Sequence, residues 1–380
     1  MRKVCSQRAS KFLGLCCRSH GVILVAACFG AGCLGLAPGG PTRNKSLREE
    51  LTERSAHEGL ALVRVRNNWM QVHSFDVGPT TIRNPRFSSI ASFSGNGRYV
   101  GWRLVDPTYQ KALIGPFPVI IESLDGSYSW QLPGHVLGVG VLDVSFDGRR
   151  AVFSGVWQPT DVSKDGGRIQ GIGAVQREAA GIYYADSERN VVTRITGLAD
   201  QPNDVSSISW SPDGKAFVYD SQGRIYIYIF ATASRRFIAE GLAPAWSPDG
   251  TRIAFTSAQN TAVVMDLKTN KTKVLLNGDK IEWAVHWSPD SRYVMVSQLR
   301  SIILDLLENP FEDRTFKLAI YRIDDGATVS DDIRTSGVDD TGFYWVTDYR
   351  AFLKGASVPP KIRLDEDSAG VVVVPKVNRR

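Results

Sequence analysis

One five-residue pattern occurs three times between residues 210 and 291, each time as a tryptophan followed by Ser-Pro-Asp. The copies are Trp210-Ser211-Pro212-Asp213-Gly214, Trp246-Ser247-Pro248-Asp249-Gly250 and Trp287-Ser288-Pro289-Asp290-Ser291. Ser-Pro-Asp-Gly favours a tight β-turn, because proline fixes φ at the second position, aspartate tolerates the third and glycine accepts a positive φ at the fourth. A repeated turn behind a large aromatic residue indicates a repeat architecture, which decides the fold class before any single element is assigned.

Apolar residues follow each tryptophan at constant distances. The positions seven and nine residues later hold Phe217 and Tyr219, Ile253 and Phe255, and Val294 and Val296. Because alternate residues share one face of a strand, each turn is expected to lead into a strand with an apolar face. Weaker copies of the template begin at Phe93 and Val144. A degenerate copy begins at Ser336 and places Phe343 and Trp345 at the seventh and ninth positions. Successive copies are 36 to 66 residues apart, which is room for about four short strands, or one propeller blade.

These patterns predict an all-β fold, a β-propeller of six four-stranded blades. Residues 59–66, 70–77 and 370–374 also have the sequence of strands, and helical periodicity is nearly absent after residue 60. A propeller has to cover its first and last strands, since free edges invite pairing with other chains. We therefore expect the ring to be closed by an N-terminal strand that completes the blade made by the C-terminus. The motif tryptophans are expected between blades, where they and the turns hold the ring together without forming a functional site.

The Trp-Ser-Pro-Asp-Gly turn with a strand behind it resembles the TolB-type, WD40-like (PD40) β-propeller repeat of bacterial envelope proteins. The resemblance covers about residues 85–350 by repeat pattern, and it implies a propeller that works in the cell envelope. TolB itself carries an α/β domain ahead of its propeller. Here only about 50 residues separate the apolar leader from the first turn, too few for a domain of typical size. The resemblance therefore does not imply TolB's own role.

Residues 1–33 have the composition of a targeting segment. They contain five basic residues and no acidic residue, and an apolar run over residues 21–37 follows the basic part. Val25-Ala26-Ala27-Cys28 matches the pattern in which a lipidated cysteine becomes the mature N-terminus, and Gly30-Ala31-Gly32-Cys33 is a rival site. We predict lipidation at Cys28, with Cys33 as the alternative. An uncleaved membrane anchor and soluble export after cleavage near Ala37 are the two other interpretations.

The rest of the chain is expected to form a flexible tether, residues 34–59, and a single propeller domain, residues 60–380. The tether contains Pro38-Gly39-Gly40-Pro41 and a charged stretch with room for a short helix. All five cysteines lie in the first 33 residues, so the domain has no disulfide, cysteine-ligated metal or thiol nucleophile. Subtracting the five basic residues of the leader leaves 40 basic against 39 acidic residues, which argues against a nucleic-acid-binding surface. We expect the domain on the periplasmic side of the bacterial envelope.

The longest interval contains an insertion at residues 158–177 that is rich in glycine and charged residues. Its charged side chains include Asp161, Lys164, Asp165 and Arg168. One interpretation is a mobile loop that contacts a partner or covers the channel mouth, and the other is an insertion without consequence. A phosphate-binding loop is excluded, because no Gly-Lys-Ser/Thr follows the glycines.

Catalytic and metal-binding motifs are missing from the sequence. The histidines after residue 34 do not form a His-Glu-x-x-His pair, and no Gly-x-Ser-x-Gly elbow occurs. Neighbouring carboxylates such as Asp324-Asp325 lie in turns or point to opposite faces of a strand, so they are not expected to form one site. We therefore predict a non-catalytic module, without cofactor or metal, that binds an envelope protein or a cell-wall component. The alternative is a glycan hydrolase or lyase whose site combines His135 or His286 with carboxylates of several blades at the channel mouth.

Overall fold

The computed structural model describes residues 45–65, 69–83, 88–104, 118–137, 141–158, 180–195, 205–277, 281–303, 313–335 and 343–356. The chain separates into two units, Met1–Asn44 and Lys45–Arg380, and every described residue belongs to the second unit. Several predicted features lie outside the described residues: Cys28 and Cys33 of the leader, Asp161, Lys164, Asp165 and Arg168 of the insertion, and the strand at 370–374.

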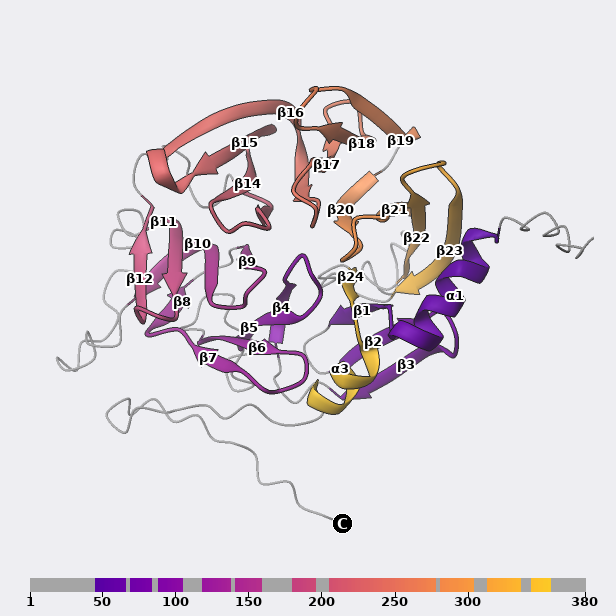
Figure 1. Ribbon diagram of the computed structural model, residues 1–380, viewed down its shortest axis with the longest axis horizontal. Helices are drawn as coiled ribbons and strands as arrows, with labels where there is room; N and C mark the ends of the chain where they lie inside the picture. The colour runs from indigo at the N-terminus through magenta and orange to yellow at the C-terminus, as the bar shows by residue number, and fades with distance from the viewer. Residues whose placement is uncertain are drawn as a thin grey trace, which may run out of the picture. The chain divides into compact units, whose positions relative to one another are not determined.

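The strands form antiparallel sheets that stand around a ring, as in a propeller (Figure 1). We number them as blades in ring order, beginning with the blade that joins the two ends of the described chain. Blade I comprises β24 (Phe343–Val346), β1 (Ala61–Val65), β2 (Trp69–Ser74) and β3 (Gly78–Arg83). Blade II comprises β4 (Ser88–Phe93), β5 (Tyr99–Leu104), β6 (Val119–Ser123) and β7 (Ser129–Gln131). Blade III comprises β9 (Leu142–Val144), β10 (Arg150–Gln158), β11 (Ala180–Asp186) and β12 (Val191–Arg194), and β8 (His135–Leu137) also pairs with β10.

Blades IV and V share the long strand β16 (Ser234–Trp246), whose first half pairs with β15 and whose second half pairs with β17. Blade IV comprises β13 (Ile208–Trp210), β14 (Ala216–Ser221), β15 (Arg224–Ile229) and the first half of β16. Blade V comprises the second half of β16, β17 (Arg252–Ser257), β18 (Thr261–Asp266) and β19 (Thr272–Asn277). Blade VI comprises β20 (Ile281–Trp287), β21 (Tyr293–Ile303), β22 (Asp313–Arg322) and β23 (Thr328–Thr335). The prediction of an all-β propeller is confirmed, and six blades can be traced through the described part of the chain.

Contacts between the innermost strands close the ring. β24 lies against β4, β4 against β9, β9 against β13, β13 against β16, β16 against β20, and β20 against β24. The first and the last described strands meet in blade I, where β1 pairs with β24 and Ala61 lies opposite Val346. The number of strands that the N-terminal part contributes to blade I differs from the expected single strand. Because β1, β2 and β3 follow one another as hairpins, three N-terminal strands form the outer part of blade I and the C-terminal part supplies one.

This closure also corrects the copy of the template placed at Ser336. That copy predicts Phe343 and Trp345 on the strand that follows a turn. In the structure they lie on the innermost strand of blade I, and Trp345 lies opposite Leu62 just as Trp210 lies opposite Phe217. Trp345 therefore occupies the tryptophan position of the repeat itself.

The apolar side chains of the template fill the space between blades. The six residues at the seventh and ninth positions are all buried: Phe217, Tyr219, Ile253, Phe255, Val294 and Val296. Between blades III and IV, for example, Val152 and Ile182 pack with Trp210 and Phe217. The expectation that each turn leads into a strand with an apolar face is confirmed.

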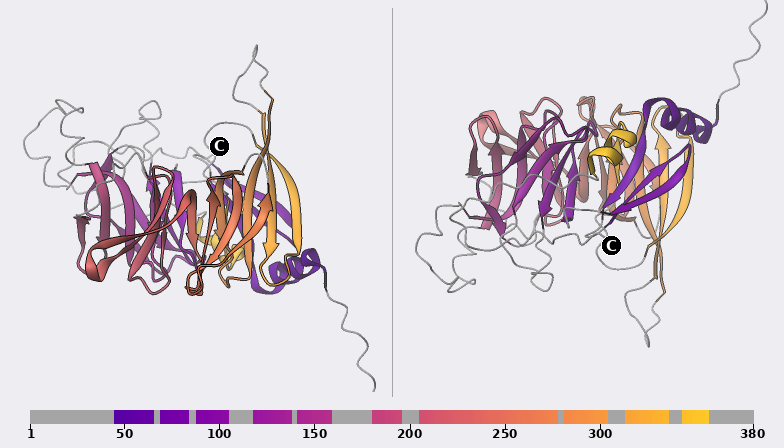
Figure 2. Two further views of the ribbon diagram at one scale, coloured as in Figure 1. Left: turned by 90° about the horizontal axis from the view of Figure 1, so that it is seen from above. Right: turned by 90° about the horizontal axis from the view of Figure 1, so that it is seen from below.

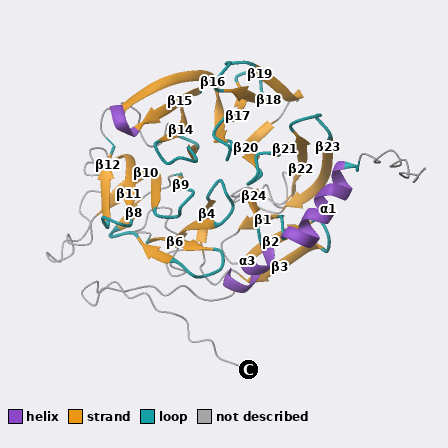
Figure 3. Cartoon of the chain, viewed as in Figure 1, coloured by secondary structure: helices purple, strands orange, loops and turns teal. Residues whose placement is uncertain are grey.

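Two α-helices occur among the described residues, α1 (Leu47–Glu58) and α3 (Tyr349–Ala356) (Figure 3). α1 begins at a capping box, in which Ser46 and Glu49 each satisfy the other's backbone N–H. Its buried side of Leu47 and Leu51 packs on blades I and VI, and Figure 2 shows the helix beside the strands of blade VI. This part of the expected flexible tether is thus a docked helix of the folded unit.

Candidate functional site

The Trp-Ser-Pro-Asp turns share one pattern of hydrogen bonds. In the first copy the Ser211 hydroxyl donates to the Asp213 carboxylate (2.7 Å) and accepts from the Ala216 N–H (3.0 Å). The fourth residue has a left-handed backbone in all three copies, with φ of 67° at Gly214, 76° at Gly250 and 61° at Ser291. Asp249 and Asp290 accept from Ser247 and Ser288 in the same way.

Turns of neighbouring blades also contact one another. The Asp249 N–H donates to the Ser291 hydroxyl (2.8 Å) across the boundary between blades V and VI. Pro212 lies so close to Gly250 that a Cβ on this glycine would be 3.2 Å from the proline ring. The motif residues therefore make the contacts that hold adjacent blades at this end of the ring.

The motif tryptophans have defined partners as well. The indole N–H of Trp210 donates to the Asp143 carbonyl in blade III (3.2 Å), and that of Trp287 donates to the Ala245 carbonyl in blade V (3.1 Å). Trp246 donates to the Gly250 carbonyl of its own turn (3.3 Å). Since Trp210 and Trp287 are both buried, they link blades and present no binding surface.

A second set of side chains, which the sequence patterns did not reveal, lies on the innermost strands. Each member is one residue before the tryptophan position of the repeat. The Asp143 carboxylate in β9 accepts from the Ser92 hydroxyl in β4 (3.0 Å) and from the Trp210 N–H in β13 (2.8 Å). Ser209 in β13 accepts from the Trp246 N–H in β16 (3.0 Å). These bonds join four consecutive innermost strands around the centre of the ring. The full set is Ser92, Asp143, Ser209, Ala245, His286 and Tyr344. Because each holds the same position in its repeat, the sequence alone could have predicted that these side chains lie close together.

Burial controls the charge of this central set. It raises the pKa of the Asp143 carboxyl to about 7, although the hydrogen bonds from Trp210 and Ser92 favour the ionised form. Burial lowers the pKa of His286 to about 4, so its imidazole is neutral at pH 7. The imidazole packs on the ring of Tyr344, with the centroids 4.9 Å apart. Burial, together with the charge of Asp143, raises the pKa of the Tyr344 hydroxyl.

The cluster of histidine and carboxylates that would favour an enzyme is not assembled in the described part of the chain. No carboxylate there hydrogen-bonds to the His286 ring, whose pKa is shifted by burial alone. His135 lies in β8. No group of His, Cys, Asp and Glu suited to a metal ion occurs among the described residues.

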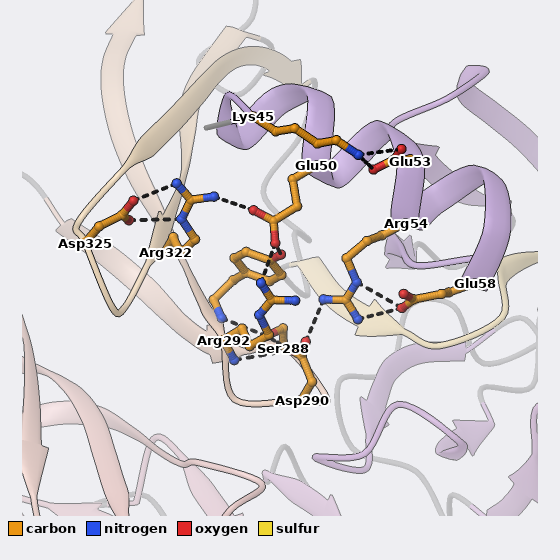
Figure 4. Close-up of polar contacts among 11 residues, drawn as sticks. Lys45, Glu50, Glu53, Arg54, Glu58, Ser288, Asp290, Arg292, Arg322 and Asp325 are labelled. Carbon is orange, nitrogen blue, oxygen red and sulfur yellow. Dashed lines mark hydrogen bonds and ion pairs between the residues drawn. The ribbon is translucent and has the colours of Figure 1, made fainter. Parts of the chain in front are cut away.

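A polar cluster fastens α1 to blade VI (Figure 4). The Glu50 carboxylate accepts from Arg292 (2.6 Å), from the Tyr293 hydroxyl (2.5 Å) and from Arg322. Although burial raises the pKa of Glu50, the hydrogen bonds from Tyr293 and Arg322 outweigh it and hold that pKa below its ordinary value. One turn later, Arg54 donates to Asp290 of the third repeat turn (2.6 Å).

Neither α1 nor α3 is long and apolar enough to cross a bilayer, and no other described helix is either.

Known proteins are similar to this chain in both sequence and fold. The chain is 38% identical over 88 residues to the Tol-Pal system protein TolB of Alcanivorax borkumensis, a match that covers 21% of this chain and 20% of the relative. Its structure matches TolB from Acinetobacter baumannii with a TM-score of 0.52 and 15% identity, over 76% of this chain and 66% of that one. The chain carries a TolB-type β-propeller.

The TolB-type likeness concerns the propeller and not a whole protein, because the sequence match spans about a fifth of the length of the curated relative. A chain of the nidogen/laminin complex is also similar, with a TM-score of 0.48 and 12% identity over 76% of this chain and 98% of that one. No protein-family model matches the chain.

Proposed function

We propose that this chain is a non-catalytic interaction module of the bacterial cell envelope, which binds an envelope protein or a cell-wall component. The observation that carries the proposal is the sequence match to a Tol-Pal system protein, joined to the TolB-type propeller fold. The most repetitive residues of the chain are engaged in holding blades together. Binding would therefore use surfaces outside the repeat turns, such as the insertion at 158–177 with Asp161, Lys164, Asp165 and Arg168.

The proposal includes attachment to the membrane through the leader, with a lipid on Cys28 or, alternatively, on Cys33. A lipid or an anchor at this point would hold the propeller close to a bilayer. Labelling of cells with radioactive palmitate tests the lipid. The label should disappear from the Cys28→Ala/Cys33→Ala double variant, and a double variant that keeps it would refute lipidation at either cysteine.

Photo-crosslinking in intact cells tests the interaction. A photoreactive amino acid at Lys164 or Arg168 samples the insertion. The matched control position is Val77, an exposed side chain on the β2–β3 turn of blade I. We expect one discrete crosslinked envelope component from the insertion and none from Val77.

A lack of any crosslink from either position, together with turnover of a cell-wall glycan by the purified chain, would favour the propeller enzyme instead. The neutral His286, packed on Tyr344, is a poor start for such a site, since acid-base catalysis at pH 7 requires a pKa near 7.

A further inference from the structure

The outer strands of blades IV and V carry positive charge that the outer strands of the other blades lack. We call residues 224–240 and 261–277 the basic rim. Residues 224–240 have three arginines against one glutamate, and residues 261–277 have three lysines against one aspartate. The corresponding part of blade II has Glu122 and Asp125 and no basic residue, that of blade VI has one more acidic than basic residue, and those of blades I and III are balanced. The near-neutral charge of the domain thus conceals an uneven distribution.

Most of these cations are directed to solvent. Four of them are exposed and make no side-chain ion pair or hydrogen bond with the described part of the chain: Arg224, Arg236, Lys268 and Lys271. The other two have partners. Arg235 lies over the Tyr226 ring, 4.5 Å from its centroid, and Lys273 donates to the Ile323 carbonyl of blade VI (2.6 Å).

Exposed apolar side chains lie among the cations. Phe237 is 53% exposed and Val274 is 51% exposed, and each lies on the outermost strand of its blade. Phe237 packs edge-on against Tyr226, with ring centroids 5.9 Å apart, and this contact fixes the position of its ring. Basic residues on edge strands protect against unwanted pairing, but that role does not explain a large apolar side chain beside them.

We propose that the basic rim docks on an anionic lipid surface. Exposed aromatic and aliphatic side chains flanked by lysine and arginine suit the boundary between headgroups and acyl chains, where the cations pair with lipid charge. The cations are spread along two neighbouring blades, which fits the extended field of a charged bilayer better than one discrete acidic ligand. The inference rests on the proposed envelope location only in that a bilayer must be near.

Hydrogen exchange of the full chain with vesicles tests the docking. The chain is mixed with vesicles of phosphatidylcholine alone or of phosphatidylcholine with 30% phosphatidylglycerol. We expect exchange at residues 234–240 and in β19 to slow several-fold on the anionic vesicles only, and to recover at high salt, because surface charge is screened. Exchange in β3, the edge strand of blade I, serves as the internal control and should not change.

A matched pair of double variants assigns the effect to the rim. Arg236→Glu/Lys271→Glu should abolish the protection, because each basic residue near an anionic surface is worth about fivefold in binding. Arg98→Glu/Lys215→Glu makes the same change of charge at exposed positions on the turns of blades II and IV. This variant should retain the protection on anionic vesicles. Melting temperatures of both variants check that the fold is intact.

Three results would overturn the proposal. Equal protection on neutral and anionic vesicles removes the role of charge. Protection that rises with protein concentration in the absence of lipid identifies a second copy as the occupant. Unchanged exchange on anionic vesicles, with protection only when an envelope protein is added, identifies a protein partner. Sedimentation with neutral vesicles reports the leader's membrane attachment separately, so a failed tether is distinguishable from a failed rim.

Discussion

Asp143 should make the stability of the propeller depend on pH in a way that one substitution removes. Its carboxyl is buried between Ser92 and the Trp210 N–H, and its pKa rises from the ordinary 3.8 to about 7. Each pH unit between those two values corresponds to about 1.4 kcal/mol, so the full effect is about 4 kcal/mol. Asparagine has nearly the same shape and can accept from Trp210 while it donates to Ser92.

The sign follows from proton binding. A raised folded-state pKa means that the folded chain holds the proton more tightly than the unfolded chain does. The contribution of Asp143 to the free energy of unfolding is therefore fully present below about pH 4 and is lost as the pH rises to about 7. Asp143→Asn has no such loss, so its stability relative to the parent chain should rise by about 4 kcal/mol from pH 4 to pH 8.

Urea unfolding at pH 4, 5, 6, 7 and 8, followed by tryptophan fluorescence, measures this difference. At each pH, the free energy of unfolding of the parent chain is subtracted from that of Asp143→Asn, so the contributions of the titrating groups that the two proteins share cancel. A difference that stays constant within about 0.5 kcal/mol across this range would refute the assignment of a raised pKa to Asp143.

Three further substitutions test the attachment of α1 and the contacts between turns of different blades, each by chemical unfolding. Leu51→Ala, at a side chain that is 1% exposed, should cost about 2–4 kcal/mol by leaving a cavity under α1; a cost below about 1 kcal/mol would mean that α1 does not stabilise the ring. Glu50→Gln should cost about 1–2 kcal/mol because it removes the charge shared by Arg292 and Arg322, whereas Glu53→Gln, in the exposed pair with Lys45, should cost less than about 0.5 kcal/mol. Gly97→Ala should cost clearly more than Gly78→Ala, since both glycines have a positive φ but only at Gly97 would the Cβ meet Pro289 and the Trp345 carbonyl, at 3.1 and 3.0 Å. Equal costs for the two alanine variants would show that contacts between turns contribute little.

Local patterns of sequence were enough to predict the strands and turns. A turn such as Ser211 to Gly214 forms through contacts between residues at most five positions apart, and the alternation at Phe217 and Tyr219 is visible within one strand. The composition of blade I could not be predicted in the same way, because its innermost strand, β24, is separated from its other three strands by most of the sequence. The template therefore places Trp345 on the wrong strand of its blade.

The central set and the attachment of α1 depend on residues far apart in the chain. Asp143 bonds to a backbone N–H 67 positions away, and Glu50 bonds to Arg322 272 positions away. No spacing within a window of sequence reveals such pairs, and a single sequence shows no covariation between them. The charge of the rim was hidden for a different reason, because a balanced total over the domain says nothing about where the cations gather.

Constraint in this propeller decreases from the centre of the ring to its rim. An innermost strand is held by its own blade and by both neighbouring innermost strands, as Asp143 and Ser209 show. Within the described part of the chain, an outermost strand such as β19 pairs with a single strand, so a change there costs little stability. Side chains at the centre make the hydrogen bonds that join the blades. Among the described residues, rim side chains such as Arg236 and Phe237 make no contact between blades that an innermost strand depends on. Phe237 packs edge-on against Tyr226 and is still 53% exposed, and the proposed lipid docking would give this exposed apolar surface a partner.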